Sequence, residues 1–232
     1  MERILGSLLA VDEPVKRIYS SPLRQEQARR TRRRMVEAAR SSFLARGYVA
    51  TTVPAVARAA GVSADTVFHV FGTKRDLLRA TLDVVVGGDD EDVALLDRPD
   101  PQRLRTEPDP VTQLRLLAAG IAGQMARVAP MDAVLRGAAA VDPEVAALRA
   151  DVQDRQRREA MATVVGWVAA HGPLLLPEAD AATAVWALTS PEVHDLLVAR
   201  SGWDDERYRT WLGDTLVRTL LGPGVLSPPG PA

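Results

Sequence analysis

Residues 63–69 concentrate side chains whose chemistry suits contact with a polyanion better than catalysis. Val67, Val70 and Phe71 are spaced i, i+3, i+4, which predicts a short helix with these three turned inward. The outward side then carries Ala64, Asp65, Thr66, Phe68 and His69. A hydroxyl or a methyl, as on Thr66, can meet the edge of a base, and a carboxylate can accept from cytosine. Asp65 is better explained as favouring a helix N-terminus, and His69 is equally consistent with a solvated surface.

Two elements must position these side chains. Residues 53–60 place Val53, Val56, Ala57 and Ala60 on one face with a period near 3.6, which predicts a preceding helix. Gly61 can adopt the positive φ that ends it, and Ser63 is a good N-cap for the next helix. Two short helices joined by a glycine turn predict a helix-turn-helix, whose second helix can enter the major groove of DNA.

The ends of these helices offer candidate phosphate contacts. Thr52 is expected to cap the first helix, with Pro54 in its first turn, where a missing N–H costs nothing. Free N–H groups and a hydroxyl at such a helix start also suit a phosphate, although a plain cap is an equal alternative. Lys74 follows the predicted turn at residues 72–73 and is placed to meet a phosphate.

Charge is divided unevenly along the chain of 232 residues, whose net charge is −1. Residues 24–79 carry twelve basic against four acidic side chains, whereas residues 80–232 carry 14 against 23. Basic side chains dominate affinity for nucleic acid, so the basic part is where a polyanion would dock. Arginines crowd residues 24–34, and we expect a flexible arm there, with Arg33 and Arg34 as DNA contacts; a solubilising tail is the alternative.

Composition excludes several classes of protein. The chain has no cysteine, which rules out disulfides and thiolate metal sites and fits a reducing cytoplasm. No apolar run approaches the roughly 20 residues that span a bilayer, so a cytoplasmic protein is expected. We find no phosphate loop, nucleophile elbow or metal-binding histidine pair, and therefore expect no cofactor, no metal and no enzyme activity. The acidic run at residues 89–92 lacks the spacing of a calcium loop.

Residues 33–86 closely resemble the DNA-binding domain of the tetracycline-repressor (TetR) family of transcriptional regulators. The resemblance rests on Phe43, Gly47, Tyr48, Thr51–Val53, Val56, Ala57, Ala60–Ser63, Thr66–Phe68, Phe71, Lys74, Leu77 and Leu78. It implies DNA contacts at Thr52, Ala64, Thr66, Phe68, His69 and Lys74. Three departures bear on how firmly DNA would be held: Phe68 stands at a frequent tyrosine, Val70 at a frequent histidine or tyrosine, and Pro54 at a frequent polar residue.

The sequence pattern after residue 86 predicts mainly helices. Residues 87–110 form an acidic, proline-rich linker with a short helix near residues 93–96 or 101–104. Helices are then expected at 111–127, from Pro130 to 140, 143–170 with Asp142 as cap, 177–188, 191–200 and from Asp204 onward. The polar middle of the third of these helices, residues 151–159, is expected to be exposed.

This second part resembles the ligand-binding and dimerisation domain of actinobacterial-type members of the same family, most clearly at residues 184–221. The resemblance implies a homodimer, to which the apolar stripe of the last helix would contribute Trp211, Leu212, Thr215, Leu216 and Thr219. Packing inside one subunit would leave a similar stripe. Candidate contacts for a largely hydrophobic small-molecule effector are Leu117, Ile121, Met125, Met131, Met161, Trp167 and Trp186, which could equally form plain core.

Together these patterns predict an all-α protein. Its parts are a flexible basic leader (1–30), a helix-turn-helix domain (31–86), an acidic linker (87–110), a helical ligand-binding and dimerisation domain (111–222) and a disordered tail (223–232). The function expected is a ligand-responsive regulator, most often a repressor in this family, that binds a pseudo-palindromic operator as a homodimer. The alternatives are a helical interaction protein that keeps the fold without binding DNA and, less favoured, a helical enzyme.

Overall fold

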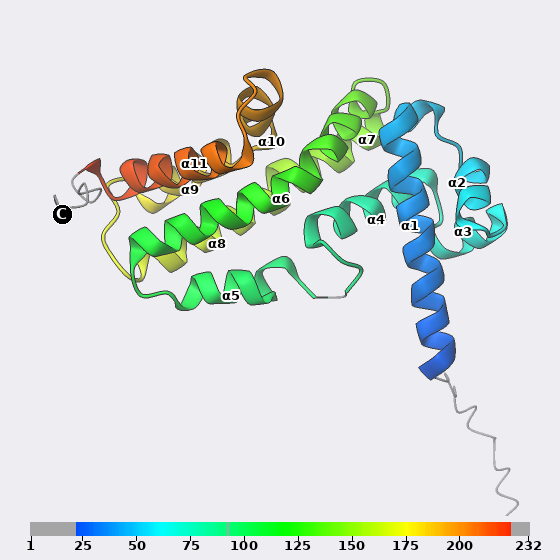
Figure 1. Cartoon of the computed structure of the whole chain (residues 1–232), viewed down its shortest axis with the longest axis horizontal. Coiled ribbons are helices and arrows are strands. Elements are labelled where there is room, and N and C mark those ends of the chain that lie inside the picture. The colour runs from blue at the N-terminus through cyan, green and yellow to red at the C-terminus, as the bar shows by residue number, and fades with distance from the viewer. Residues whose placement is uncertain (1–21, 92, 224–232) are drawn as a thin grey trace, which may run out of the picture.

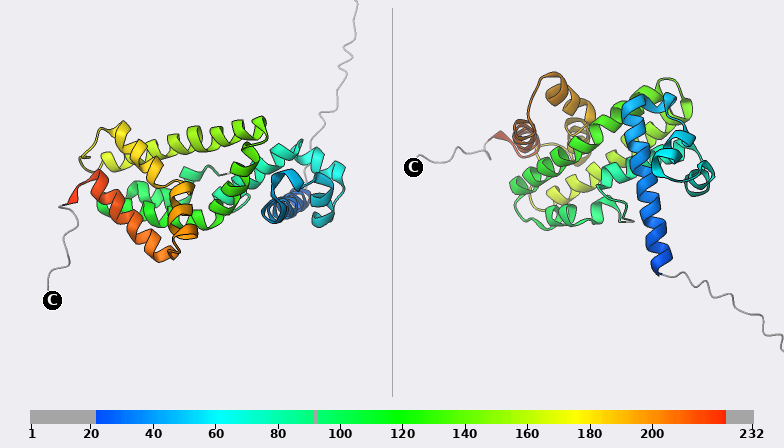
Figure 2. Two further views of the ribbon diagram at one scale, coloured as in Figure 1. Left: turned by 90° about the horizontal axis from the view of Figure 1, so that it is seen from above. Right: turned by 45° about the vertical axis from the view of Figure 1, so that its right-hand side comes forward.

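The computed structural model describes residues 22–91 and 93–223, and within them every regular element is a helix. The predicted all-α class is therefore confirmed. Three helices and the long α1 form a head at one end of an elongated molecule, and the remaining helices form a larger body (Figures 1 and 2). The predicted tail beyond residue 223 and the leader up to residue 21 lie outside the described residues.

The head is built from α1 (Pro22–Ala50), α2 (Val53–Ala60), α3 (Ala64–Phe71) and α4 (Lys74–Gly87). Gly47 interrupts α1 with a φ of 74°, a left-handed conformation that ends the regular part of the helix. The small core of the head contains Phe43, Val56, Val67 and Leu77, each at most 1% exposed. α4 begins with a capping box, in which Thr73 and Asp76 each satisfy the other's backbone N–H.

The start of α1 differs from the prediction of a flexible arm up to residue 30. The helix begins at Pro22, so residues 22–30 are helical, with exposed side chains from Leu23 onward. Proline is favourable at the first position of a helix, and Arg, Gln, Glu and Leu are good helix formers. Repulsion between the arginines is small on a solvated helix, so helix propensity outweighs it.

The connection between head and body is partly ordered. A short 3₁₀ turn, η1 (Leu95–Asp97), and α5 (Pro99–Thr106) lie where short helices were expected within the linker. α5 packs on the body through the buried Leu104, whose carbonyl accepts from Gln113 Nε2 at 3.0 Å. Asp89 pairs with Arg98 at 2.6 Å, so part of the acidic run is neutralised rather than free.

α6 (Pro110–Ala139) is a single helix of 30 residues that runs through Pro130. The prediction of two helices separated at this proline is wrong. A proline removes one backbone hydrogen bond and crowds the preceding turn, but it does not have to end a helix that is held by packing. Packing holds α6 on both sides of Pro130, because Val128, Met131 and Leu135 are buried.

The body is completed by α7 (Pro143–Ala150), α8 (Arg157–Ala169), α9 (Glu178–Leu188), α10 (Pro191–His194) and α11 (Asp205–Leu220). Two π-helical turns, η2 (Asp151–Gln156) and η3 (Asp195–Arg200), make α7 continuous with α8 and extend α10. The helix predicted from 143 to 170 is thus present. Its polar middle is not uniformly exposed, however, because Gln153 is buried and Arg157 is half-buried, each with a partner on another helix.

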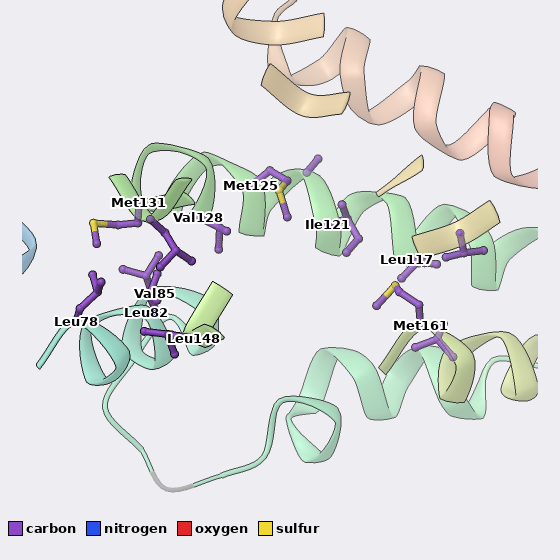
Figure 3. Close-up of a cluster of buried hydrophobic side chains, with 14 of the residues drawn as sticks. Leu78, Leu82, Val85, Leu117, Ile121, Met125, Val128, Met131, Leu148 and Met161 are labelled. Atoms are coloured by element: carbon purple, nitrogen blue, oxygen red, sulfur yellow. The ribbon is translucent and has the colours of Figure 1, made fainter. Parts of the chain in front are cut away.

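One apolar core joins the two parts. Figure 3 shows Leu78, Leu82 and Val85 of α4 pointing toward Val128 and Met131 of α6, with Leu148 beside them. Further along α6, Leu117 faces Met161 of α8. Within residues 22–91 and 93–223, none of the helices combines the length and the apolar character that crossing a bilayer requires.

Candidate nucleic-acid interface

Local hydrogen bonds fix the helix-turn-helix. Thr52 caps α2 by accepting from Ala55 N at 3.3 Å, and Ser63 caps α3 by accepting from Thr66 N at 3.1 Å. Between them, Gly61 has a φ of 68°, a left-handed conformation that glycine adopts without steric cost. Both predicted caps and the predicted turn are therefore confirmed, and local hydrogen bonds define where α3 begins.

The outward side of α3 presents a mixed surface. Asp65, Phe68 and His69 are exposed, whereas Ala64 and Thr66 are half-buried. The hydroxyls of Thr66 and Ser63 lie 2.8 Å apart and share a hydrogen bond. A hydroxyl held in this way keeps one fixed direction, and a lone pair or proton remains for a base edge.

Val70 does not turn inward as predicted. Val67 is 1% exposed, but Val70 is 40% exposed and Phe68 47% exposed. A helix of eight residues has room for one buried stripe, and Val67 with the half-buried Phe71 fills it. Phe68 and Val70 thus add apolar surface to the exposed side of α3, where a thymine methyl group is the matching feature in a major groove.

Lys74 occupies a different place from the one predicted. Its ammonium group donates to the carbonyl oxygens of Tyr48 at 2.8 Å, Thr51 at 3.0 Å and Val49 at 3.4 Å. It also lies 4.1 Å from the centre of the Tyr48 ring, and burial lowers the pKa of Lys74. An ammonium group has three N–H donors, and all three are used here.

Lys74 therefore holds the end of α1 against the start of α4. Carbonyl groups at the C-terminal end of a helix lack partners within the helix, and a cation there satisfies them and favours the helix dipole. In this conformation all three donors are used within the chain, and the predicted phosphate contact of Lys74 stays a prediction. Sequence reasoning missed the role because the partners lie 23 to 26 residues earlier in the chain.

Arg33 and Arg34 are exposed on α1, as a contact with a polyanion requires. Arg32 beside them is engaged: it pairs with Asp90 at 3.2 Å and lies over the ring of Phe71 at 4.9 Å. Arg34 also lines a surface groove between α1 and α2, together with Arg46 and Arg58. Arg46 and Arg58 were not among the predicted contacts, because their approach across two helices is not visible in the sequence.

The predicted effector contacts lie in the interior of the body. Leu117, Ile121, Met125, Met131 and Met161 are at most 7% exposed. Trp167 and Trp186 are half-buried, and the indole N–H of Trp186 donates to the carbonyl of Gln153 at 2.9 Å. The structure brings several of these residues together along α6, as Figure 3 shows, but their service as ligand contacts stays a prediction.

The residues of α11 predicted for the dimer interface fall into two groups, one fully buried and one half-buried. Leu212 and Leu216 are 0% exposed and face the inside of the single chain, where α11 packs on α6. They expose no surface in the single chain, and their part in a dimer interface stays a prediction. Trp211, Thr215 and Thr219 are half-buried and keep the surface that an interface needs. Tertiary packing of α11 explains the division, because the inner half of an apolar stripe goes to the subunit's own core.

A buried polar cluster in the body was missed altogether. Asp132 of α6 is 1% exposed, and it accepts from Gln153 Nε2 at 3.1 Å and pairs with Arg136 at 3.0 Å. His194 is 6% exposed, and its ring meets that of Tyr208 edge to face at 4.9 Å. Buried polar residues carry no periodic signal, so only the isolated Asp and His within apolar segments could have pointed to them.

A capped helix-turn-helix on a basic head, joined to a helical body, defines a class: helical DNA-binding regulators. Within that class, residues 35–81 match the family described as bacterial regulatory proteins, tetR family. This match covers α2, α3 and parts of α1 and α4, which together make up most of the head. No curated protein matches the chain significantly.

Solved structures resemble the chain over most of its length. NalD, the secondary repressor of the MexAB-OprM multidrug efflux pump in Pseudomonas aeruginosa, has a TM-score of 0.63 at 20% identity, over 84% of this chain and 98% of NalD. SmeT, the repressor of the Stenotrophomonas maltophilia pump SmeDEF, has a TM-score of 0.57 at 18% identity, over 87% and 96%. A protein from Saccharomonospora viridis in complex with choline has a TM-score of 0.59 at 18% identity, over 82% and 97%. At these identities the likeness establishes that head and body together have a TetR-like fold.

Proposed function

We propose that this protein is a ligand-responsive transcriptional repressor that binds a pseudo-palindromic operator as a homodimer. The observation that carries the proposal is the helix-turn-helix of residues 53–71, which is fully capped and presents Asp65, Phe68 and His69 to solvent within the matched family domain. The N-terminal residues of a recognition helix normally reach base edges, and in α3 these include the exposed Asp65 and the half-buried Thr66. Arg33 and Arg34 would add contacts to the backbone phosphates.

A homodimer follows from the geometry of DNA recognition. One head reads only a few base pairs, and two heads related by a two-fold axis read half-sites in successive major grooves. The partly exposed side of α11, with Trp211, Thr215 and Thr219, is the surface proposed for the partner. Similar proteins that are repressors, NalD and SmeT, support repression as the direction of control.

Control would come from a small molecule bound in the body. α4 packs against α6 in one apolar core, so a ligand that moves the body helices would also move the heads. The coupling is reciprocal: a ligand that weakens DNA binding is itself bound less tightly by the DNA complex. The choline complex of the similar S. viridis protein supports a small-molecule site. Such a regulator would act in the cytoplasm and catalyse no reaction.

The test is a footprint of the purified protein on the DNA upstream of its own coding sequence. We expect one protected pseudo-palindrome, with half-sites about one helical turn or more apart, and an affinity that falls steeply with salt. Thr66→Ala should relax base preference, whereas wild-type protein should prefer the protected site over random DNA by at least about 10³. Equal affinity for the upstream DNA and for random DNA would refute the proposal and favour an interaction protein without sequence recognition.

A further inference from the structure

The buried polar cluster of the body draws one or more residues from each of its major helices. Asp132 comes from α6, Gln153 from η2, Arg157 from α8, Thr189 from the end of α9, His194 from α10 and Tyr208 from α11. Arg157 donates to the carbonyl of Trp186 and to the hydroxyl of Thr189, the latter at 3.2 Å. A few polar groups that converge within an otherwise apolar interior are a feature of small-molecule sites.

Several of these groups have no partner. Both ring nitrogens of His194 and the hydroxyl of Tyr208 are buried and make no hydrogen bond with the described residues. A buried polar atom without a partner costs free energy, so it is rare in native proteins and calls for an explanation. The two side chains touch each other, and Arg157 is near enough to Tyr208 for each to affect the other's ionisation.

The charged side chains of the cluster differ in whether they have an ion-pair partner. Asp132 is paired with Arg136, and Glu192 is paired with Arg149. Arg157, in contrast, has no carboxylate partner among the described residues; its hydrogen bonds go to a carbonyl and a hydroxyl. Glu192, Asp132 and Asp154 act on Arg157 electrostatically from a distance, and Asp205 and Asp195 act on His194. Arg157 is thus a guanidinium that no carboxylate of the described residues contacts directly, and an incoming anion would be its first ion-pair partner.

Burial also shifts the pKa values of Arg157, Tyr208 and His194. Desolvation lowers the pKa of Arg157 to about 10 and raises the pKa of Tyr208 to about 12, so at neutral pH the first is charged and the second keeps its proton. Desolvation also lowers the pKa of His194, which leaves its imidazole neutral with one N–H to donate. A guanidinium, a phenol and an imidazole that can all donate, in a site of low dielectric, are suited to bind the two oxygens of one carboxylate.

We propose that the effector site of this protein recognises a small organic carboxylate, held by Arg157, Tyr208 and His194, with its apolar part along α6. This inference rests on the proposed function of the body as a sensor domain. Met125 lies two turns before Asp132 on the same face of α6, and Ile121 one turn further, so apolar surface leads away from the polar end. The ligand is thus amphipathic, which differs from the largely hydrophobic effector that the sequence suggested.

Entry of the ligand requires movement of a helix. Tyr208 is 0% exposed and His194 6% exposed, so a molecule that reaches them must separate α10 or the first turn of α11 from the rest of the body. α10 is four residues long and continues into the π-helical turn η3. A short element of this kind opens more readily than the long helices around it.

The experiment measures binding to the free protein, without DNA. Thermal shift and equilibrium dialysis would use straight-chain carboxylates of two to twelve carbons and benzoate, each matched with its neutral primary amide. We expect at least one carboxylate to bind at least tenfold more tightly than its amide. Tyr208→Phe and Arg157→Gln should each remove at least a tenfold part of that preference. Arg158→Gln is the matched control, since Arg158 is exposed and stacks on Trp186 at 4.0 Å.

Two outcomes of these measurements would overturn the proposed carboxylate site. If no carboxylate binds more tightly than its amide, or if Tyr208→Phe binds the carboxylate as well as wild type does, the proposal is overturned. Tyr208→Phe removes one oxygen atom only, so it keeps the test valid if Arg157→Gln fails to fold. The operator footprint is a separate measurement: carboxylate binding without a footprint would refute the proposed repressor and leave the carboxylate site standing.

Discussion

At the scale of single residues, the head depends on side chains that act as structural donors. Lys74 satisfies carbonyl groups left open where α1 ends, and Thr51 does the same by donating to the carbonyls of Gly47 at 2.7 Å and Ser42 at 3.0 Å. Ser63 and Thr66 fix the first turn of α3. The side chains that would read DNA are therefore positioned by neighbours whose own hydrogen bonds are already complete.

Lys74→Met tests this assignment of Lys74. The variant keeps an unbranched apolar side chain against Tyr48 but loses three N–H donors, so the free energy of unfolding should fall by about 1 kcal/mol or more. The slope of log affinity for DNA against log salt should stay as in wild type, because no phosphate contact is lost. Urea unfolding and salt-dependent anisotropy measure the two quantities. Unchanged stability together with a salt slope smaller by about one would restore the phosphate contact and reject the structural role.

His194 should make the stability of the protein depend on pH. Burial lowers its folded-state pKa below the usual value near 6.5, partly opposed by Asp205 and Asp195. The unfolded chain then binds a proton at a higher pH than the native protein does. Stability conferred by the neutral imidazole is fully present above about pH 6.5 and is lost as the pH falls toward the lower folded pKa.

His194→Phe should flatten this part of the profile below about pH 6.5, because a phenyl ring can keep the edge contact with Tyr208 and takes up no proton. His171→Phe serves as the control, since His171 is exposed. Thermal unfolding at half-unit steps of pH would show the difference. A profile for His194→Phe that coincides with that of wild type would mean that His194 is not the titrating group.

At the scale of elements, α1 has two functions in one helix. Its C-terminal half carries buried residues such as Met35 and Phe43, and its N-terminal extension carries exposed arginines. A helix presents charges in fixed positions, unlike a flexible arm, so binding pays less ordering entropy for each contact formed. The exposed start of α1 is thus a preformed basic surface that projects beyond α2 and α3 (Figure 1).

The double variant Arg33→Gln/Arg34→Gln should weaken binding to operator and random DNA by similar factors. The salt slope should fall by about two, because about 0.9 counterions are released for each phosphate neutralised. Arg103→Gln/Arg105→Gln is the matched control, with two exposed arginines on α5 in the body. Anisotropy titrations at several salt concentrations give both slopes. A similar loss in the control pair would indicate a general effect of net charge rather than contacts from α1.

The helices show what local sequence can and cannot determine. Caps at Thr52, Ser63 and Asp204, and the turn at Gly61, were predictable because donor and acceptor lie within a few residues. Continuation of α6 through Pro130 and burial of Gln153 were not, since packing between distant segments decides both. The same holds for the candidate site: the outward side of α3 follows from period alone, but contacts of Lys74 and Arg157 span more than 20 residues.

At the scale of the whole molecule, ion pairs join head and body beside the apolar core. Arg75 of α4 pairs with Glu144 of α7, and Arg79 of α4 pairs with Asp151 at 3.3 Å. Asp151 is the first residue of η2, which also contains Gln153, the partner of Asp132. Within three residues, the same turn therefore contacts the DNA-binding head and the buried polar cluster.

Arg79→Gln and Asp151→Asn should each shift operator affinity in the same direction, and the double variant should shift it no further than one of them does. Each substitution removes the same Arg79–Asp151 ion pair, so the two effects on affinity should not add. The interaction free energy of such a partly exposed pair is about 0.2–1 kcal/mol. Arg155→Gln is the control, because Arg155 pairs with Asp151 within the same helical segment and does not reach α4. Additive effects of the two substitutions would show that the pair does not transmit between head and body.

The π-helical turn η2 also determines where the chain could lose a residue here. A π turn holds one residue more than an α-helical turn at nearly the same rise. Deleting one of residues 151–156 would restore an unbroken α-helix and leave its composition almost unchanged. Because the extra residue is taken up within one turn, this deletion would leave the later side chains of α8 at nearly their present angles. Deleting a residue from the regular helix that follows would instead rotate every later side chain of α8 by about 100° about the helix axis. The apolar side of α8 would then turn away from α6. In α8, unlike in η2, the spacing of the residues matters as much as their identity.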